Sequence, residues 1–196
     1  MKRGFDFLFS SFCLFCSAPL WVVIPLAIKL EDGGPVFFRQ GRVGKDRSHF
    51  LVMKFRSMVP DAEKEGEAVM AATNDPRMTR VGYLLRKTAM DELPQLLNIW
   101  KGEMSFVGPR ALREAENIMG EKGGFWVQMD QIEGYALRHS VRPGLTGLAQ
   151  VYAARDIHHR HKFKYDLLYI KKMSFWLDMK LIALSFRNTF TAKWQV

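Results

Sequence analysis

The stretch from Phe7 to Ile28, FLFSSFCLFCSAPLWVVIPLAI, contains no charged residue. Such a run is long enough to cross a bilayer as a helix, which needs about 20 apolar residues. A cleaved signal peptide would share the basic residues Lys2 and Arg3. However, the apolar run is too long for that class, and no small-x-small cleavage site closes it. The segment therefore predicts an element that stays with the chain and associates with a membrane.

Two prolines inside this run argue against a straight helix. Pro19 and Pro25 each remove a backbone hydrogen bond and favour a kink. Basic residues, which prefer the cytoplasmic side of a membrane, flank the run on both sides. A helix that enters, breaks near Pro19 and leaves on the same side satisfies both flanks, and we favour this re-entrant form. The residues alone leave an ordinary bent span open. The flanking residues are Lys2 and Arg3 before the run, and Lys29, Arg39, Arg42, Lys45 and Arg47 after it.

The charge balance of the chain points to anionic partners. Lys and Arg together number 29 against 20 Asp and Glu, a formal net charge of +9. This balance suits nucleic acid, an acidic membrane surface or phosphorylated small molecules, and composition does not choose among them. The two cysteines, Cys13 and Cys16, both lie in the apolar run. Their number excludes a disulfide framework.

Beyond residue 30 the sequence predicts one α+β unit that is predominantly helical, with a small β-hairpin. Two apolar runs, Val36–Phe38 and Phe50–Phe55, flank a polar turn that contains glycine, which is typical of a hairpin. Charged residues 61–72 predict an exposed helix. Asp75 and Pro76 predict the cap and first position of the next helix.

The second half of the unit is also expected to be mostly helical. Residues 111–139 are predicted to form helices with a glycine-rich interruption, and residues 160–190 to form helices throughout. In the last of these, aromatic and aliphatic residues surround Lys180 and Arg187. That composition predicts an amphipathic helix at a membrane interface.

The motif TAMDELPQ, residues 88–95, places two adjacent carboxylates just ahead of a proline. Proline is tolerated in the first turn of a helix, so Pro94 predicts a helix start with Asp91 near the cap and Glu92 in the first turn. Acids are favoured there by the helix dipole, and a cap alone explains the local pattern. The same geometry keeps a carboxylate ionised, so that it can act as a nucleophile or bind Mg²⁺. The local pattern leaves both interpretations open.

Several basic residues in turn-like contexts could hold phosphates around this pair. Arginine forks match phosphate oxygens in a bidentate way, and lysine adds a point charge. Each alone is a weak signal, because most such residues are solvated surface. The candidates are Lys54 and Arg56 in KFRSM, Arg86, Arg110 in GPR, and Arg142 in RPGLTG.

Five stretches of the chain resemble one bacterial family. They are FFRQGRVGKD, KFRSM, NDPRMTRVGYLLRKTAMDELPQLLNIWKGEMSFVGPRAL, RPGLTGLAQV and YDLLYIKKMSFWLDMKLI. In this order they look like the bacterial sugar transferases, the monotopic phosphoglycosyl transferases that place a sugar 1-phosphate on a polyprenyl phosphate carrier. The resemblance covers nearly the whole chain, and the long block from Asn74 to Leu112 is highly specific.

The resemblance implies a role for each candidate residue. The family's Asp-Glu dyad falls on Asp91 and Glu92. Asp91 would attack the β-phosphorus of a UDP-sugar and expel UMP, and polyprenyl phosphate would attack the resulting aspartyl phosphosugar in a ping-pong route. Mg²⁺ would neutralise the diphosphate, with Asp91 and Glu92 as its ligands. The family's phosphate-binding positions fall on Lys54, Arg86, Arg110 and Arg142, and an acid that supports them from behind falls on Asp166.

The resemblance also implies where the protein works. Residues 1–30 would form a re-entrant helix broken near Pro19, inside one leaflet of the bacterial inner membrane with both termini cytoplasmic. Residues 31–196 would form a catalytic domain on the cytoplasmic face. The partners implied are a UDP-sugar, polyprenyl (undecaprenyl) phosphate and membrane lipid; nucleic acid is not expected, and a homodimer is left open. One feature departs from the family, which often has Ser-Pro at the break: here Ala18 precedes Pro19, and Ser17 lies one place earlier.

Two other functions are held against this one. A non-catalytic basic module could bind a membrane surface or nucleic acid through charge and aromatic residues alone. A Mg²⁺-dependent hydrolase of nucleotide sugars would use water as its acceptor. The apolar N-terminal segment favours a lipid acceptor over water.

Overall fold

The computed structural model describes residues 1–60, 62, 75–113, 117–119, 126–154 and 157–191. In these ranges the chain is mostly helical and carries three small two-stranded sheets, so the α+β class is confirmed. The exposed helix predicted for residues 61–72 lies outside the described residues.

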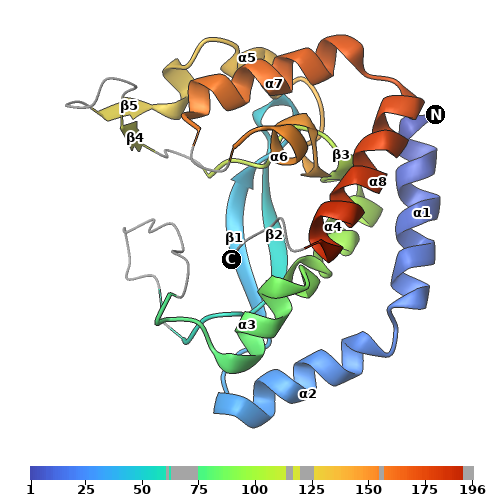
Figure 1. Ribbon diagram of the computed structural model, residues 1–196, viewed down its shortest axis with the longest axis vertical. Coiled ribbons are helices and arrows are strands. Elements are labelled where there is room, and N and C mark those ends of the chain that lie inside the picture. Colours follow the sequence, from blue (N-terminus) through green and yellow to red (C-terminus); the bar gives the residue numbers. More distant parts are fainter. Residues whose placement is uncertain (61, 63–74, 114–116, 120–125, 155–156, 192–196) are drawn as a thin grey trace.

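Two helices joined at a sharp bend form the N-terminal part. Helix α1 spans Lys2–Cys16 and α2 spans Leu20–Asp32, with a bend of 61° between them. In Figure 1 they run down one side of the molecule and along its base. In the described ranges no single helix has the length and apolar character to cross a membrane, whereas this bent pair together meets those criteria. The predicted break near Pro19 is therefore confirmed, while Pro25 lies inside α2 without ending it.

The hydrogen bonds at the break explain how this chain manages without Ser-Pro. The Ala18 amide donates to the Phe15 carbonyl at 3.2 Å, one position short of the Leu14 carbonyl that a continuous helix would use. The Ser17 hydroxyl donates to that Leu14 carbonyl at 3.2 Å and accepts from Trp21 Nε1 at 3.2 Å. A serine one place earlier thus satisfies a carbonyl at the bend.

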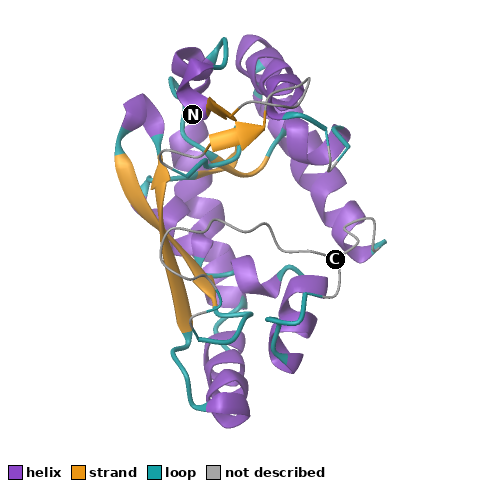
Figure 2. Ribbon diagram, turned by 90° about the vertical axis from the view of Figure 1, so that its left-hand side faces the viewer, coloured by secondary structure: helices purple, strands orange, loops and turns teal. Residues whose placement is uncertain are grey.

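The predicted hairpin is confirmed and runs through the middle of the molecule (Figure 1). Strand β1 (Phe37–Val43) pairs antiparallel with β2 (His49–Phe55), and a short 3₁₀ turn η1 (Lys45–Arg47) connects them. Turned by 90°, the hairpin lies along one edge with helices packed to one side of it (Figure 2). Alternation along β2 directs Phe50 and Val52 into the main core and Phe55 into a second one.

The two cores tie the N-terminal helices to the rest of the chain. The main core joins β2 to α4 (Gln95–Lys101), β3 (Ser105–Val107), α7 (His159–Lys172) and α8 (Phe175–Phe190), and residues of α1 pack against it. The second core joins α2 to α3 (Arg80–Lys87) and to the end of β2. Residues of α1 and α2 therefore share apolar clusters with the unit that follows them.

Polar contacts also hold α1 in place. The Asp178 carboxylate of α8 accepts from Lys2 Nζ at 2.5 Å and from the Tyr169 hydroxyl at 2.7 Å. One turn along α1, the buried Asp6 carboxylate accepts from the Ser105 hydroxyl at 3.1 Å and from the Phe106 amide at 3.2 Å. Because Asp6 is only 1% exposed, these bonds satisfy a carboxylate that would otherwise be costly to bury.

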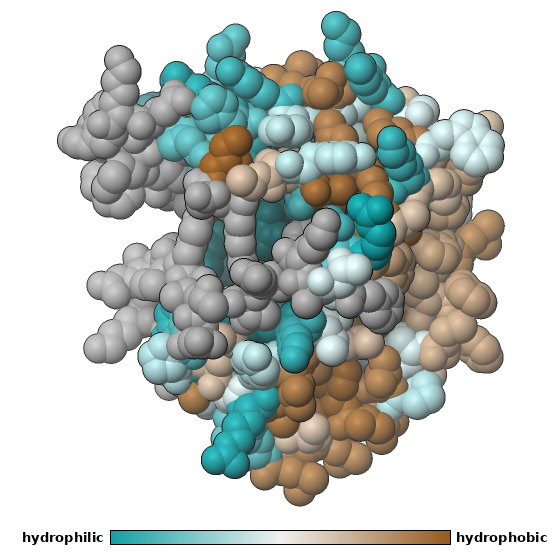
Figure 3. Space-filling model, viewed as in Figure 1, coloured by the Kyte–Doolittle hydropathy of each residue, from teal (hydrophilic) through white to brown (hydrophobic). Residues whose placement is uncertain are grey.

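An apolar surface follows the outer sides of α1 and α2. Figure 3 shows hydrophobic residues along the side and base of the molecule where these helices lie in Figure 1. Large contiguous patches of exposed apolar residues mark membrane or protein contacts. The most exposed apolar residues there are Leu8, Phe12, Phe15, Val22, Val23, Leu26 and Leu30, joined on α8 by Trp176, which is 80% exposed.

Two local predictions are wrong. Helix α3 begins at Arg80 with Thr79 as its cap, four residues beyond the predicted cap Asp75. The Asp75 carboxylate instead accepts from the backbone and guanidinium of Arg77, which holds a turn that competes with a helix.

Residues 111–139 are also not mostly helical in their described part. Strands β4 (Asn117–Met119) and β5 (Trp126–Gln128) pair antiparallel, followed by η3 (Met129–Gln131) and the four-residue helix α5 (Tyr135–Arg138). The pairing aligns Ile with Val and Met with Trp, residue types that suit strands.

Candidate functional site

A small pocket brings several of the predicted residues together. The Nζ atom of Lys54, which lies in β2, is 2.5 Å from Oε1 of Glu92. Lys54 follows Phe50 and Val52 on the same face of β2, so the strand's alternation directs it inward. The lining residues are Arg42, Val52, Lys54, Glu92, Gln95, Met104, Arg110, Ala111, Gly144 and Leu145.

The carboxylate pair lies in its own 3₁₀ turn, η2 (Met90–Glu92), directly after α3. Helix α4 begins at Gln95 with Pro94 just before it, so Asp91 is not the cap of α4 that the sequence predicted. Ala89 enters the turn with φ of 56°, a left-handed conformation that is strained for a residue with a Cβ. Asp91, two residues further along the turn, is buried and only 8% exposed.

The two carboxyl groups have opposite electrostatic environments. Burial raises the pKa of Asp91 to about 6, opposed by Lys54 and Arg86 and reinforced by Glu92. Burial also disfavours the ionised form of Glu92, but Lys54 and Arg110 outweigh it and lower the pKa of Glu92 below its usual range. Burial therefore opposes the ionisation that was expected for Asp91 at a helix start, although a pKa of about 6 still leaves it mostly ionised at neutral pH.

The GPR and RPGLTG motifs lie side by side because glycine lets their backbones touch. Strand β3 pairs in parallel with β6 (Gly144–Thr146), and Arg110 forms a further bridge to Gly144. A Cβ on Gly108 would stand 2.4 Å from the Arg142 carbonyl, and one on Gly144 would stand 2.1 Å from the Gly108 amide nitrogen. Any larger residue at either position would push the two motifs apart. This contact puts Arg110 at the pocket.

The remaining basic candidates differ in where they lie. Arg86, in the last turn of α3, is close enough to Asp91 to oppose the rise in its pKa. Arg142 donates from Nε to the Gly102 carbonyl at 2.6 Å, at the C-terminal end of α4, and does not line the pocket. The phosphate-binding role of Arg142 stays a prediction.

Asp166 is connected to the pocket through Arg138, a residue that was not predicted from the sequence. Its Oδ2 lies 2.7 Å from Nε of Arg138, and both side chains are 3% exposed. The Arg138 guanidinium also donates to the carbonyl of Arg110. Burial raises the pKa of Asp166, with Arg138 opposing the shift. The pair thus holds the backbone of the GPR motif, and no local signal in the sequence pointed to Arg138.

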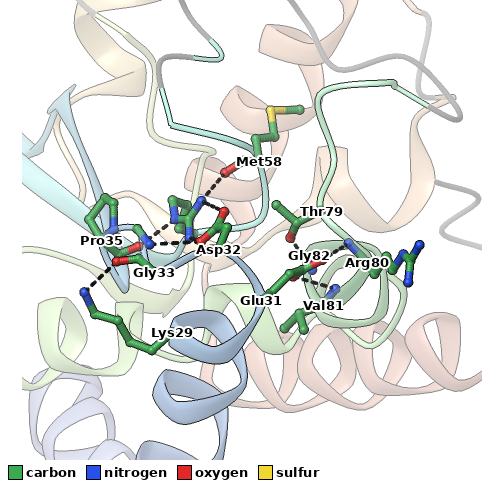
Figure 4. Close-up of polar contacts among 12 residues, drawn as sticks. Lys29, Glu31, Asp32, Gly33, Pro35, Met58, Thr79, Arg80, Val81 and Gly82 are labelled. Atoms are coloured by element: carbon green, nitrogen blue, oxygen red, sulfur yellow. Dashed lines mark hydrogen bonds and ion pairs between the residues drawn. The ribbon is translucent and has the colours of Figure 1, made fainter.

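Arg56, a further phosphate candidate, has a different task. It is 6% exposed, pairs with Asp32 through both carboxylate oxygens, and donates to the carbonyls of Pro35 and Met58. These contacts join the end of α2 to the end of β2 (Figure 4). The expectation that Arg56 is available to a phosphate is therefore wrong.

Next to Asp32, Glu31 holds the start of α3. Its carboxylate accepts from the amides of Arg80 at 2.6 Å and Val81 at 3.1 Å (Figure 4). These are first-turn amides that have no partner inside the helix. Helix α3 therefore has one end held by α2 and leads at its other end into the Asp91 turn.

The adjacent carboxylates of Asp91 and Glu92 suit Mg²⁺. Asp91 and Glu92 supply hard carboxylate oxygens, and Mg²⁺ is commonly held by one or two carboxylates together with substrate phosphates and water. The described residues contain no cluster of three or more His, Cys, Asp or Glu side chains able to hold a metal ion. A Mg²⁺ ion at this pair would therefore take most of its ligands from substrate and water.

Comparison with known proteins places the whole chain beside one family. A family model described as bacterial sugar transferase matches residues 1–192. The chain is 42% identical over 195 residues to the UDP-N-acetylgalactosamine-undecaprenyl-phosphate N-acetylgalactosaminephosphotransferase of Aeromonas hydrophila, covering 97% of this chain and 44% of that protein. It is 42% identical over 197 residues to the UDP-glucose:undecaprenyl-phosphate glucose-1-phosphate transferase of Klebsiella pneumoniae, covering 98% and 40%.

The chain spans less than half the length of these two relatives. A relative of similar size is the exopolysaccharide production protein PSS of Rhizobium leguminosarum bv. phaseoli, which is 40% identical over 187 residues. That match covers 93% of this chain and 91% of that protein. The names of the first two relatives carry different sugars, so similarity at this level does not select one.

Proposed function

This chain belongs to the bacterial sugar transferase family, and from that premise we propose that it transfers a sugar 1-phosphate from a UDP-sugar to undecaprenyl phosphate. The products are undecaprenyl diphosphate sugar and UMP. The observation that carries the proposal is the buried Asp91 beside the Glu92–Lys54 pair, in a basic pocket also lined by Arg110. The names of the relatives supply the donor and acceptor classes.

In the first step, an Asp91 carboxylate oxygen attacks the β-phosphorus of the donor. A bond forms between that oxygen and phosphorus, the bond from phosphorus to the bridging oxygen breaks, and UMP leaves with the electron pair. Lys54 and Arg110 offset the negative charge that the departing group gains. Glu92, whose pKa is lowered by these two cations, stays ionised beside them.

In the second step, a phosphate oxygen of undecaprenyl phosphate attacks the phosphorus of the aspartyl phosphosugar. The bond from phosphorus to Asp91 breaks and the free carboxylate is restored. Asp91 and Glu92 would hold Mg²⁺, which would supply charge neutralisation for the diphosphate. Because donor and acceptor react in turn with the same carboxylate, this scheme predicts ping-pong kinetics.

The N-terminal helices suit a lipid acceptor. We place residues 1–30 in one leaflet at the cytoplasmic face of the bacterial inner membrane, with residues 31–196 as the catalytic domain. The exposed apolar side chains of α1 and α2, together with the 61° bend, support this placement. It brings the Asp91–Glu92 pair close to the bilayer that holds the acceptor.

The activity test measures UMP release by the detergent-solubilised protein with Mg²⁺ and a panel of UDP-sugars. With undecaprenyl phosphate, we expect many turnovers; without it, release should stop at about one UMP per protein, because the covalent intermediate accumulates. Asp91→Asn should abolish both phases. Multiple turnovers without the lipid would support a hydrolase instead. No release with any sugar, or full release by the variant, would reject the mechanism.

The topology test uses cysteines introduced at Gly4 and Gly41, where no atom lies within 4 Å of an added Cβ. The native Cys13 and Cys16 are replaced by serine so that they do not react. In intact cells, a membrane-impermeant thiol reagent should label neither site, and both should react after the cells are opened. Labelling of one site from outside would mean that the chain crosses the membrane.

A further inference from the structure

Gln95 is a buried residue of the pocket with an unused hydrogen-bond donor. It is the first residue of α4 and is only 5% exposed. Within the part of the chain that the structure describes, its Nε2 is buried and has no hydrogen-bond partner. Most buried polar groups in proteins are bonded, so an orphaned donor in a pocket points to a ligand that supplies the acceptor.

The surroundings of Gln95 specify the chemistry of that acceptor. Lys54, Glu92 and Arg110 line the same pocket. The Gln95 amide is near enough to Glu92 to help lower its pKa, but the two make no hydrogen bond of normal geometry. Two cations and a neutral donor around one space suit an anion with several acceptor oxygens, and a phosphate has this form.

The place of Gln95 in the chain points to one phosphate of the donor. Gln95 lies three residues after Glu92, at the start of α4, and lines the same pocket as the Glu92 carboxylate. Asp91 is the neighbour of Glu92 in the η2 turn. In the proposed function, the phosphorus bonded to Asp91 is the one that is transferred. Its oxygens gain charge in the transition state, where a prepositioned donor contributes most.

We propose that Gln95 binds the transferred phosphoryl group by donating a hydrogen bond from Nε2 to one of its non-bridging oxygens. The inference rests on the proposed function and adds to it a residue that contacts the reacting group. Because the amide is neutral, Gln95 can hold this oxygen without lowering the negative charge that Asp91 needs for attack. The contact is present with every UDP-sugar, since it involves phosphate and not sugar.

The test compares Gln95→Met with Gln150→Met. Methionine keeps the length of glutamine and removes the donor, and Gln150 is a matched control because its amide is also buried without a partner but does not line the pocket. UMP release by full-length protein is measured against UDP-sugar concentration at several pH values. UMP inhibition and thermal unfolding are measured on the same samples.

We expect Gln95→Met to lower kcat/KM by about 10- to 100-fold, the range for a hydrogen bond to a charged group. Inhibition by UMP, the group that leaves, should stay within about twofold of wild type, and Gln150→Met should keep nearly full activity per folded molecule. Gln95→Glu should lose more activity than Gln95→Met, because it adds negative charge beside the phosphate.

Three outcomes would overturn the inference. Undiminished activity of Gln95→Met would mean that the donor is not used. A loss that is recovered by changing the pH would mean that Gln95 acts only through the ionisation of Glu92. An equal loss in Gln150→Met would assign the effect to stability. Failure of the proposed function is separate, because it appears as absent UMP release in wild type.

Discussion

Two pairs of neighbouring acidic residues lie at opposite ends of helix α3. Glu31 and Asp32 end α2, and Glu31 contacts the start of α3, whereas Asp91 and Glu92 follow the last turn of α3. The first pair is exposed, and its oxygens accept from three backbone amides and from the Arg56 guanidinium. In the second pair, Glu92 lines the pocket and contacts Lys54, whereas Asp91 is buried next to it and is not one of the lining residues.

The hydrogen-bond partners and the burial of a carboxylate determine its pKa, and therefore whether it has a structural or a chemical role. Hydrogen bonds from Arg56, followed by that from the Gly34 amide, lower the pKa of Asp32 to about 2. Burial raises the pKa of Asp91 to about 6. The first carboxylate is committed to holding α2 and β2 together. The second keeps its oxygens available for phosphorus or for Mg²⁺.

The same substitution in both pairs should separate these uses. Asp91→Asn should lower UMP release by at least about 10³-fold, because an amide cannot serve as the nucleophile. Its thermal stability should equal or exceed that of wild type, since a buried charge is removed. Asp32→Asn should lower the melting temperature by leaving the buried Arg56 without its counter-charge, yet keep activity per folded molecule. Reversed outcomes would undo the comparison.

The raised pKa of Asp91 should appear in the pH dependence of activity. Because Asp91 must be ionised to attack, kcat/KM should fall about tenfold per pH unit below about 6. Glu92, Lys54 and Arg86 face Asp91 and set where this limb lies. A limb near pH 4, the ordinary carboxyl range, would contradict the burial of Asp91.

The two pairs should change the pH dependence of stability in opposite directions. Unfolding experiments at different pH values check the sign of the pKa shifts of Asp91 and Asp32. The folded protein holds the Asp91 proton to higher pH than the unfolded chain does, so this group lowers the free energy of unfolding as pH rises from about 4 to about 6. Asp32 holds its proton less tightly when folded. Its contribution is present above about pH 4 and is lost as pH falls towards about 2.

A smaller effect is expected from Glu31→Ala. It removes the acceptor for two amides at the start of α3, a loss typical of a helix cap, about 1 kcal/mol in the free energy of unfolding. Glu31→Gln, which keeps an acceptor oxygen, should lose less. Chemical denaturation measures both, and a Glu31→Ala variant as stable as wild type would show that α2 does not hold α3.

The smallest effect concerns the backbone before the second pair. Ala89→Gly removes the strain of a Cβ in a left-handed conformation, but glycine gives the unfolded chain more conformational freedom. The two effects on the free energy of unfolding should therefore cancel to within about 1 kcal/mol. Ala89→Val should be clearly destabilising, because a β-branched residue fits that conformation poorly. Equal stability of the two variants would mean that the turn before Asp91 is not strained.

Local signals in the sequence predicted much of this fold. The hairpin follows from two apolar runs around a polar turn, and the break between α1 and α2 follows from Pro19. The start of α3 could not be predicted in this way, because Asp75 and Thr79 are both good caps. Which of the two caps the helix depends partly on Glu31, whose carboxylate accepts a hydrogen bond from the Arg80 amide 49 positions away. Contacts of that kind leave no trace in a local pattern.

The site was predictable in composition but not in its electrostatics. The motifs named Lys54, Glu92 and Arg110, which the structure brings to one pocket. The raised pKa of Asp91 depends on burial by residues from several elements, and the task of Arg138 depends on contacts with α7 and with the GPR motif. Neither follows from spacing along the chain, because both require knowing which segments meet.

The lining of the pocket has a consequence for folding kinetics. Lys54, Glu92, Arg110 and Gly144 come from β2, η2, the segment after β3, and β6, which are separated by long stretches of chain. Contacts between such distant positions require large loops to close, so they form late and slowly. During refolding, helix content should therefore recover before UMP release does. UMP release should then be the last property that the refolding chain recovers.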